Sequence, residues 1–341
     1  MKKRCFTVLA VLLAAFAAAA SPASGPRPSE RKKEMTGKLS AGSETREKCF
    51  AGLFPPEIRT VAVTAPSMPG DDPASIDACL ELLRQAGLRV KVMPHARMNE
   101  EGPSKGKLVD VKLRAADFEQ AWMDPEADLI LCLRGGSGGR ELVENLNWEK
   151  LRRRPDMRVI GFSDVTTIHL AMLHEKAGHP LCGPSLRGLA VADQASLETF
   201  RTVLAGAAPE PVQLTVLRSG DAAGRILAGH LQRLAIMTKT RFRPDTRGRV
   251  IFIECPGRGP EKVSELWNGL LADGFFKNCS AVVFGRLNGC GAEEDAVIRK
   301  LAATLECPVF CGFPYSHTPR NHMLDLRKNV RVTSGGLLIF E

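Results

Sequence analysis

The sequence is poor in aromatic residues and has only a moderate excess of positive charge. Its 341 residues include three Trp and one Tyr, and 6% of them are aromatic. No stretch interleaves basic and aromatic side chains, the combination with which proteins pair with phosphates and stack on bases. The formal charge of +9 falls to +6 without the three basic residues at the extreme N-terminus. These features argue against binding to nucleic acid.

Motifs for nucleotides and zinc are also missing from the chain. The glycine-rich stretch 134–139 is not followed by Gly-Lys-Ser/Thr, and no GxGxxG occurs. No two Cys are spaced as CxxC, and the segment between Cys307 and Cys311 is Pro followed by apolar residues, which argues against a zinc site. Nine Cys remain beyond Cys5, an odd number that fits no simple disulfide framework, so their pairing stays open. From the residues alone, a zinc site is therefore improbable and a nucleotide-binding loop is only weakly supported.

The N-terminus has the layout of a secretory signal peptide. A basic start precedes an apolar run over 6–20, which ends among small residues. The run is short and Ala-rich for a stable membrane span, so we expect none after cleavage. We predict a signal peptide over 1–24, a flexible linker over 25–56 and export to the periplasm. If the segment does not act as a signal, the protein is cytoplasmic.

Strands and helices alternate through residues 57–192. Apolar segments typical of buried strands read IRTVAV, LRVKVMP, LILCL and RVIGF, and helices are expected over 73–87, 114–123 and 139–153 and after the last strand. This order predicts an α/β N-terminal domain with a mostly parallel sheet and helices on both faces. Ligands of such sheets bind at the carboxyl ends of the strands.

A polar stretch over 193–224 predicts a connector with one helix. A smaller C-terminal α/β domain is expected over 225–341. It begins near RILAGHLQRLA and contains the buried strand RVIFIE, helices over 261–273 and 293–304, and a terminal hairpin formed by KNVRV and GLLIF. The hairpin gives this domain a β-rich end.

Ser163 is the strongest candidate for a functional residue. The segment RVIGFSDVTTIHLAML predicts a strand ending at Gly161, a sharp turn at Phe162 and Ser163, and a helix from Asp164. A serine at such a turn exposes its hydroxyl, and the N–H groups of the next helix favour the negative charge that develops during acyl transfer. The alternative is that Ser163 only caps the helix.

A base and an acid for this nucleophile stand in the second domain. His317 lies in the turn-rich segment PYSHTPRN, and Glu254 ends a buried strand. An acyl-transfer enzyme needs a base that takes the proton from the nucleophile and an acid that orients the base. The turn at Gly135 and Gly136 offers a backbone N–H which, together with that of Asp164, would make an oxyanion hole.

Each of these residues has a structural alternative. Glu254 could be an acid at a strand end that faces water, and His317 could cap a carbonyl in its own loop. Ser137 is a rival nucleophile without an adjacent base, and His322 is a fallback base. His169 and the His five residues later do not align on one helix face as metal ligands would, so we assign them to packing or to the surface.

Together the segments resemble the LD-carboxypeptidase family of serine peptidases, which includes murein tetrapeptide carboxypeptidases and microcin C immunity peptidases. The resemblance covers 58–341 and rests on the joint order of TVAVTAPS, ADLILCLRGGSGG, VIGFSDVT, VIFIE, SAVVFGRLNGC and VFCGFPYSHTPRN. It implies a triad of Ser163, His317 and Glu254, with an oxyanion hole from the backbone of Gly136 and Asp164. It also implies a homodimer, no cofactor, and a site between an α/β N-terminal domain and a smaller C-terminal domain.

The chain differs from the family's usual sequence at several positions near these motifs. Ser137 stands where the glycine turn usually carries an aromatic, and Arg258 lies in a turn that is often acidic. His230 replaces the Asn of a Gly-Gly-Asn-Leu segment, and residues 324–327 replace a Leu-Pro-Leu-Gly run. These changes leave the triad intact and bear on the choice of substrate.

The activity implied by the resemblance is hydrolysis of the amide between an L-centre and a terminal D-residue. The leading expectation is release of D-Ala from a murein tetrapeptide, with Ser163 as nucleophile, His317 as base and Glu254 as the residue that orients it. One alternative is hydrolysis of a peptidyl- or aminoacyl-nucleotide antibiotic, as in the immunity branch. Another is an inactive exported protein that binds wall peptides.

Overall fold

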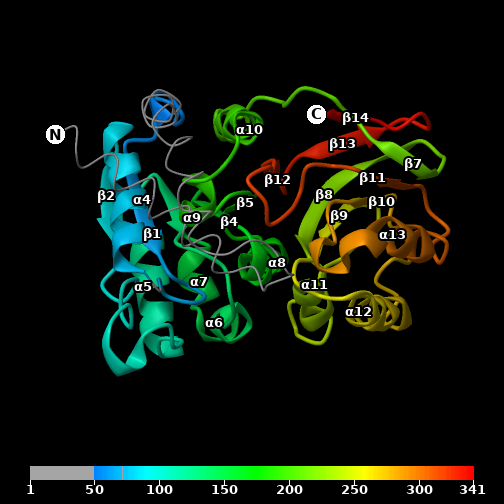
Figure 1. The fold of residues 1–341 in the computed structure, drawn as a ribbon. Coiled ribbons are helices and arrows are strands. Elements are labelled where there is room, and N and C mark those ends of the chain that lie inside the picture. Colours follow the sequence, from blue (N-terminus) through cyan, green and yellow to red (C-terminus); the bar gives the residue numbers. More distant parts are fainter. Residues whose placement is uncertain (1–49, 71) are drawn as a thin grey trace, which may run out of the picture.

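The computed structural model describes residues 50–70 and 72–341, which form two sheets with helices around them (Figure 1). This architecture confirms the predicted α/β fold with a mostly parallel N-terminal sheet. The predicted signal peptide over 1–24 and most of the predicted linker over 25–56 lie outside the described residues. Within the part that is described, no helix is long and apolar enough to cross a membrane.

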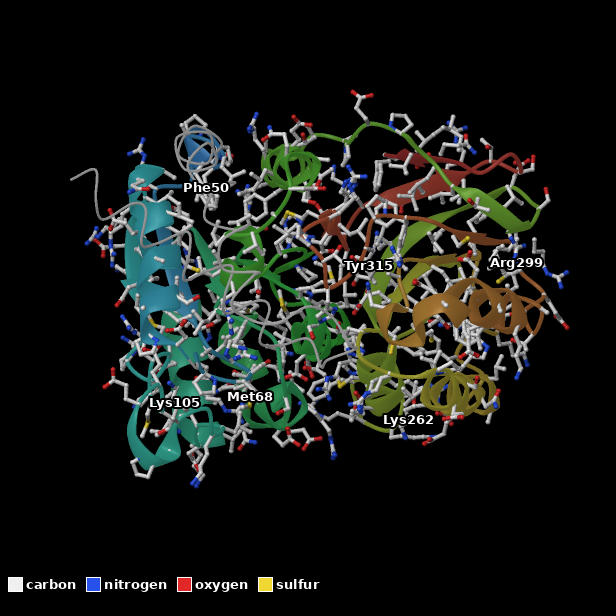
Figure 2. The ribbon with its side chains drawn as sticks, in the orientation of Figure 1. Phe50, Met68, Lys105, Lys262, Arg299 and Tyr315 are labelled. Carbon is white, nitrogen blue, oxygen red and sulfur yellow. The ribbon has the colours of Figure 1, made fainter. Side chains whose placement is uncertain are left out.

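The last residues of the predicted linker belong to the packed core. Phe50, Leu53 and Phe54 are all buried, and Phe50 lies against the N-terminal half of the molecule (Figure 2). The rings of Phe54 and Phe200 meet edge to face with centroids 5.5 Å apart. Ordered structure therefore begins before Ile58, because three large apolar side chains at 50–54 find partners in the core.

The N-terminal sheet has the strand order β12-β5-β4-β3-β1-β2. Its first five strands in the chain are β1 (Thr60–Thr64), β2 (Arg89–Val92), β3 (Leu129–Cys132), β4 (Arg158–Gly161) and β5 (His179–Cys182). These five pair in parallel, as expected for strands joined by helical crossovers. The edge strand β12 (Leu324–Asp325) runs antiparallel to β5, so the far end of the chain returns to the N-terminal sheet.

Helices cover this sheet. They are α4 (Pro73–Gln85), α5 (Val111–Met123), α6 (Gly139–Asn145), α7 (Trp148–Leu151), α8 (Thr166–Glu175) and α9 (Leu186–Leu189), with the short 3₁₀ turns η1 (Gly102–Ser104) and η2 (Ser163–Val165). The single helix predicted over 139–153 is two helices in the structure. The backbone becomes extended at Leu146, and the Asn147 side chain accepts a hydrogen bond from the Lys150 N–H, which starts a second helix.

The C-terminal sheet has the strand order β6-β14-β13-β8-β9-β10-β11-β7. The strands are β6 (Val212–Gln213), β7 (Thr215–Arg218), β8 (Ala222–His230), β9 (Arg249–Glu254), β10 (Ala281–Phe284), β11 (Val309–Cys311), β13 (Asn329–Val332) and β14 (Leu337–Phe340). The four central strands, β8 to β11, are parallel. The antiparallel pair of β13 and β14 is the terminal hairpin that the sequence predicts.

The elements around this sheet include part of the predicted connector. The helices are α10 (Gln194–Leu204), α11 (Leu231–Met237), α12 (Pro260–Ala272) and α13 (Glu294–Ala302), with the 3₁₀ segment η3 (Asn288–Glu293). The connector over 193–224 holds α10 and also β6 and β7, which form the two edges of the C-terminal sheet. Leu214, which lies between β6 and β7, is buried in the core of that sheet, and Val216 of β7 packs against it.

The two halves meet at the turn between β4 and α8, where side chains of the N-terminal half pack on the C-terminal half. Phe162, which precedes Ser163, packs in a buried cluster with Phe252, Phe313 and Tyr315 of the C-terminal half. The rings of Phe162 and Tyr315 lie edge to face at 5.2 Å, and Figure 2 shows Tyr315 near the middle of the molecule. Helices α8 and α11 pack against each other at the same boundary (Figure 1). This contact brings the carboxyl ends of β4, β8 and β9 toward one site.

Candidate active site

Ser163 occupies a strained turn between β4 and α8. Its φ angle is +65°, a region that residues with a side chain rarely adopt. Only glycine fits at position 161 of this turn, because a Cβ there would lie 2.7 Å from Cγ1 of Val165, which is too close. The buried Phe162 anchors the other side of the turn. Ser163 itself is only partly buried, so the backbone presents its side chain at the edge of the sheet.

Glu254 and His317 form a pair beside this turn. Glu254 is the last residue of β9 and is fully buried, and its Oε2 lies 2.8 Å from Nδ1 of His317. The other carboxylate oxygen, Oε1, is buried without a hydrogen-bond partner among the described residues. A carboxylate in this position favours a proton on Nδ1 of the imidazole, which leaves Nε2 as the basic nitrogen.

The imidazole of His317 is held against the nucleophile segment. Its ring centroid lies 4.7 Å from that of Phe162, the residue before Ser163, and 5.9 Å from that of His230. The His317 side chain remains 29% exposed, so the ring can reach a substrate. No hydrogen bond joins the Ser163 hydroxyl to His317 among those of the described residues. In free enzymes this contact often tightens only when the substrate arrives.

The glycine turn packs directly on Ser163. A Cβ on Gly135 would lie 2.7 Å from Cβ of Ser163, and a Cβ on Gly136 would lie 2.4 Å from Cγ of Met68. Gly136 has a φ of +127°, so both its conformation and its surroundings require glycine. The bare backbone of this turn lies next to Ser163, where a tetrahedral intermediate would form.

Asp164 ties the turn and the helix start together. Its carboxylate is buried, and Oδ2 accepts hydrogen bonds from the Ser67 hydroxyl at 2.7 Å and from the Gly139 N–H at 2.8 Å. The side chain therefore fixes the loops after β1 and β3 around its own backbone N–H. These contacts hold the loops after β1 and β3 next to Asp164, one of the two residues whose N–H groups are expected to bind the oxyanion.

Arg233 of α11 crosses from the C-terminal half to this loop cluster. Its Nη2 donates a hydrogen bond to the Gly136 carbonyl at 2.6 Å, and its Nε forms an ion pair with Oδ1 of Asp164 at 2.7 Å. One guanidinium thus contacts both residues whose N–H groups are expected to bind the oxyanion. Reasoning from the sequence missed Arg233, because the segment HLQRLA has no feature that distinguishes this Arg from a surface residue.

His230 stands next to Glu254 on the neighbouring strand, in register with it. Its Nδ1 accepts a hydrogen bond from the Gln232 N–H at 3.1 Å and so caps α11. Burial lowers the pKa of His230 to about 4. The ring is therefore neutral at pH 7 with its proton on Nε2. His230, which stands where the family usually has Asn, thus lies within the site and is a neutral hydrogen-bond donor beside His317.

Among the described contacts, none joins Ser137, His322 or His169 to Glu254 or His317. Ser137 is exposed, and no base lies against it among the described contacts. His322 packs on Phe313 rather than on Phe162, and its Nε2 is buried with no hydrogen-bond partner in the part of the chain that the structure describes. His169 is buried in α8 with Nε2 3.2 Å from the Val159 carbonyl, which is a packing role.

Other features of the described residues lie outside the triad. No group of three His, Cys, Asp or Glu side chains within them could hold a metal ion. A cavity of about 270 Å³ lies between the end of α10 and the C-terminal strand, where Val203, Asp325 and Phe340 line it. No member of the triad lines this cavity.

Comparisons with known proteins match both halves of the chain. Residues 61–180 match the family model described as the LD-carboxypeptidase N-terminal domain, and residues 223–332 match the LD-carboxypeptidase C-terminal domain. A protein of Streptomyces coelicolor that is named a carboxypeptidase is 32% identical over 268 residues, 75% of this chain and 84% of that protein. The murein tetrapeptide carboxypeptidase of Pseudomonas aeruginosa is 27% identical over 229 residues, 62% of this chain and 74% of that protein.

Solved structures show the same fold. The muramoyltetrapeptide carboxypeptidase from Oxalobacter formigenes superposes with a TM-score of 0.70 at 23% identity, covering 82% of this chain and 97% of that chain. An MccF-like protein from Bacillus anthracis superposes with a TM-score of 0.74 at 16% identity, covering 83% of this chain and 96% of that chain. At these identities the likeness establishes the arrangement of the two domains.

Proposed function

The chain belongs to the LD-carboxypeptidase family, and we propose that it is a serine carboxypeptidase that releases the terminal D-alanine of murein tetrapeptides. One observation carries the serine mechanism. The strained turn that presents Ser163 lies beside an imidazole, His317, which a buried carboxylate, Glu254, holds by its Nδ1. These are the three roles that acyl transfer by a serine requires.

Acylation follows from this geometry. His317 Nε2 takes the proton of the Ser163 hydroxyl as the oxygen attacks the carbonyl of the scissile amide. The backbone N–H groups of Gly136 and Asp164 bind the oxyanion that forms. The carboxylate of Glu254 stabilises the imidazolium, which then gives its proton to the departing amine of the D-residue. The bond to nitrogen breaks and an acyl-enzyme remains on Ser163.

Deacylation uses the same groups in reverse. His317 takes a proton from water, the resulting nucleophile attacks the ester of the acyl-enzyme, and the proton returns to Ser163 as the bond breaks. The products are the free D-amino acid and a shortened peptide that ends in a carboxylate. The partial exposure of His317 gives water access to the nitrogen that needs it.

The choice of substrate rests on the sequence relatives. The Pseudomonas aeruginosa relative is named for murein tetrapeptides, and a Bacillus subtilis relative that is 28% identical over 283 residues is named for murein peptides. We propose further that the protein is exported, on the basis of its N-terminal segment, and that it acts as a homodimer in the manner of its family. Export would bring it to the wall or to peptide fragments outside the inner membrane.

The proposal is tested by mass spectrometry of a purified disaccharide tetrapeptide incubated with the protein. We expect the loss of one alanine with the native protein and none with Ser163→Ala. A tetrapeptide that ends in L-Ala serves as the matched control and should stay intact. Cleavage of an aminoacyl-sulfamoyl adenosine instead of the tetrapeptide would identify a nucleotide-conjugate hydrolase. Tight binding of the tetrapeptide without product, by folded protein, would identify a binding protein. Either result would overturn the proposal.

A further inference from the structure

Two thiols face each other at a point remote from the triad. The Cys279 S–H donates to Sγ of Cys307, and the two sulfurs are 3.5 Å apart. Cys279 precedes β10 by two residues and Cys307 precedes β11 by two residues. Because these strands are parallel neighbours, with Val282 beside Val309, the thiols lie at the same end of the sheet. They are 28 residues apart in the chain, so the contact is a product of the fold.

The backbone geometry suits a covalent bond between them. Carried back from the pairing of Val282 with Val309, the register places Cys307 opposite Ser280, so Cys279 is its diagonal neighbour. With strands about 4.8 Å apart and a rise of about 3.3 Å per residue, diagonal Cα atoms lie roughly 6 Å apart, within the range of roughly 4.4 to 6.8 Å that disulfides use. Closing the two sulfurs to a bond length of about 2 Å requires only side-chain rotation and a small backbone adjustment. The remaining described Cys show no such contact between two sulfurs.

We propose that Cys279 and Cys307 form a disulfide bond when the protein meets a disulfide oxidant such as glutathione disulfide. The Cys307 thiolate attacks one sulfur of the oxidant and releases one glutathione thiolate, which leaves a mixed disulfide on Cys307. Cys279 loses its proton and attacks Sγ of Cys307, which expels the second glutathione thiolate. Two protein thiols are oxidised and one glutathione disulfide is reduced to two thiols.

The surroundings assign the first attack to Cys307. Cys307 is only partly buried, whereas Cys279 is 8% exposed. The hydrogen bond from Cys279 lowers the pKa of the Cys307 thiol, and the same contact together with burial raises the pKa of Cys279. The more accessible sulfur is therefore also the one that more readily becomes a thiolate.

The disulfide would leave the triad undisturbed. Ala281 of β10 pairs with Val250, near the start of β9, whereas Glu254 ends that strand. The thiols therefore lie at the amino ends of these parallel strands, whereas Glu254 and His317 lie at or beyond their carboxyl ends. Formation of the bond is inferred from the contact between the thiols and does not depend on the proposed substrate or on export.

Tryptic mapping of the full chain tests the bond directly. Cleavage after Lys277, Arg286, Lys300 and Arg320 places Cys279 in peptide 278–286 and both Cys307 and Cys311 in peptide 301–320. Reduced protein is treated with glutathione disulfide, alkylated, and digested without reductant. We expect a cross-linked pair of these two peptides, with the combined mass lowered by two hydrogens, and its loss on reduction.

Single variants identify the sulfur within the larger peptide. Cys307→Ser should abolish the cross-link, whereas the matched control Cys311→Ser should keep it and should still show a higher melting temperature in oxidised than in reduced form. Recovery of both peptides fully alkylated from folded, oxidant-treated wild-type protein would overturn the proposal. Loss of the cross-link in Cys311→Ser alone would also overturn it. Mapping of the wild-type chain decides the question even if the Cys307→Ser chain does not fold.

Discussion

The two halves of the active site are built by different means. In the N-terminal half, the backbone places the functional groups: Ser163 adopts a φ of +65°, and Gly136 adopts +127° where no side chain would fit. In the C-terminal half, a side-chain contact places the functional group. Glu254 is fully buried, and its Oε2 lies 2.8 Å from Nδ1 of His317. Ser163, the proposed nucleophile, is therefore positioned by local turns, and His317, the proposed base, by a contact between residues 63 positions apart.

This difference predicts how each half responds to substitution. The N-terminal half of the site is sensitive to the size of its side chains, because a Cβ added at Gly135 or Gly136 would lie less than 3 Å from a neighbouring atom. A half built on one buried carboxylate is sensitive to charge, because its partner relies on that carboxylate for its tautomer and orientation. The following substitutions separate these two dependencies.

The largest effect is expected at Ser163 itself. Ser163→Ala and Ser163→Gly both remove the nucleophile, so each should lower kcat by about 10⁴-fold or more. The two variants should differ in stability, because only glycine adopts a positive φ without strain. We expect Ser163→Gly to be more stable than Ser163→Ala by about 1 kcal/mol in urea denaturation. Equal stability of the two would show that the turn is not strained.

The next effect concerns the charge of Glu254. Glu254→Gln keeps the volume of the side chain and removes the carboxylate, so kcat should fall by about 10³- to 10⁴-fold. Asp117→Asn is the matched control, because Asp117 is also a buried carboxylate that holds a histidine, His95, at 2.8 Å. Its kcat should stay within a few-fold of the wild type. An equal loss in both variants, measured on folded protein, would show that the effect is general rather than due to the triad.

The packing behind the nucleophile predicts a dependence of stability on pH. Burial lowers the pKa of His169 from its ordinary value of 6.5 to about 4. The unfolded chain therefore binds more protons than the folded chain between these pH values. The stability that the neutral imidazole contributes is fully present above pH 6.5 and is lost as the pH falls toward 4, by about 2 kcal/mol at pH 5.

A variant isolates this contribution from other groups. His169→Gln keeps a donor for the Val159 carbonyl and does not titrate, so it should lose less stability than the wild type between pH 7.5 and pH 5. Urea denaturation at the two pH values measures the difference. An identical loss in both proteins would assign the acid sensitivity to other residues, among them His230, whose pKa burial also lowers to about 4.

The sequence predicts the backbone-built half better than the other. The strand, turn and helix around Ser163 follow from a local pattern, and the order of strands and helices follows from the alternation of apolar segments. The contact of His317 with Glu254 is different, because it depends on a loop and a strand end that only the complete fold brings together. The sequence supplied the two residues as candidates through their types and contexts and through resemblance.

Some features had no local signal at all. The return of Leu324 and Asp325 to the N-terminal sheet, across the expected domain boundary, involves two residues that no strand pattern distinguishes. The burial of Phe50, Leu53 and Phe54 was not predicted, because the stretch that precedes them is polar in composition. The role of Arg233 depends on the distance between two domains, which the sequence does not contain.

Substitution of Arg233 is expected to have the smallest effect on activity among these variants. It tests most directly how the two halves of the site are joined. Its guanidinium holds the Gly136 carbonyl and the Asp164 carboxylate at once, so it positions the backbone-built half from the other domain. Lysine keeps the charge but cannot make both contacts from one planar group. We expect Arg233→Lys to lower kcat about tenfold with little change in KM, since the loosened loop would bind the transition state less well than the substrate.

A second Arg offers a matched control for this interpretation. Arg241 also crosses between the halves, where its Nη1 lies 2.7 Å from Oε1 of Glu175 at the end of α8, away from the glycine turn. If Arg233 acts by positioning the oxyanion hole, Arg241→Lys should keep the wild-type kcat while both variants retain similar melting temperatures. If both variants lose activity equally, the two Arg side chains act by holding the two halves together. The glycine turn at Gly135 and Gly136 would then not depend on Arg233 in particular. A rise in KM at constant kcat in Arg233→Lys would instead place the guanidinium in contact with the substrate.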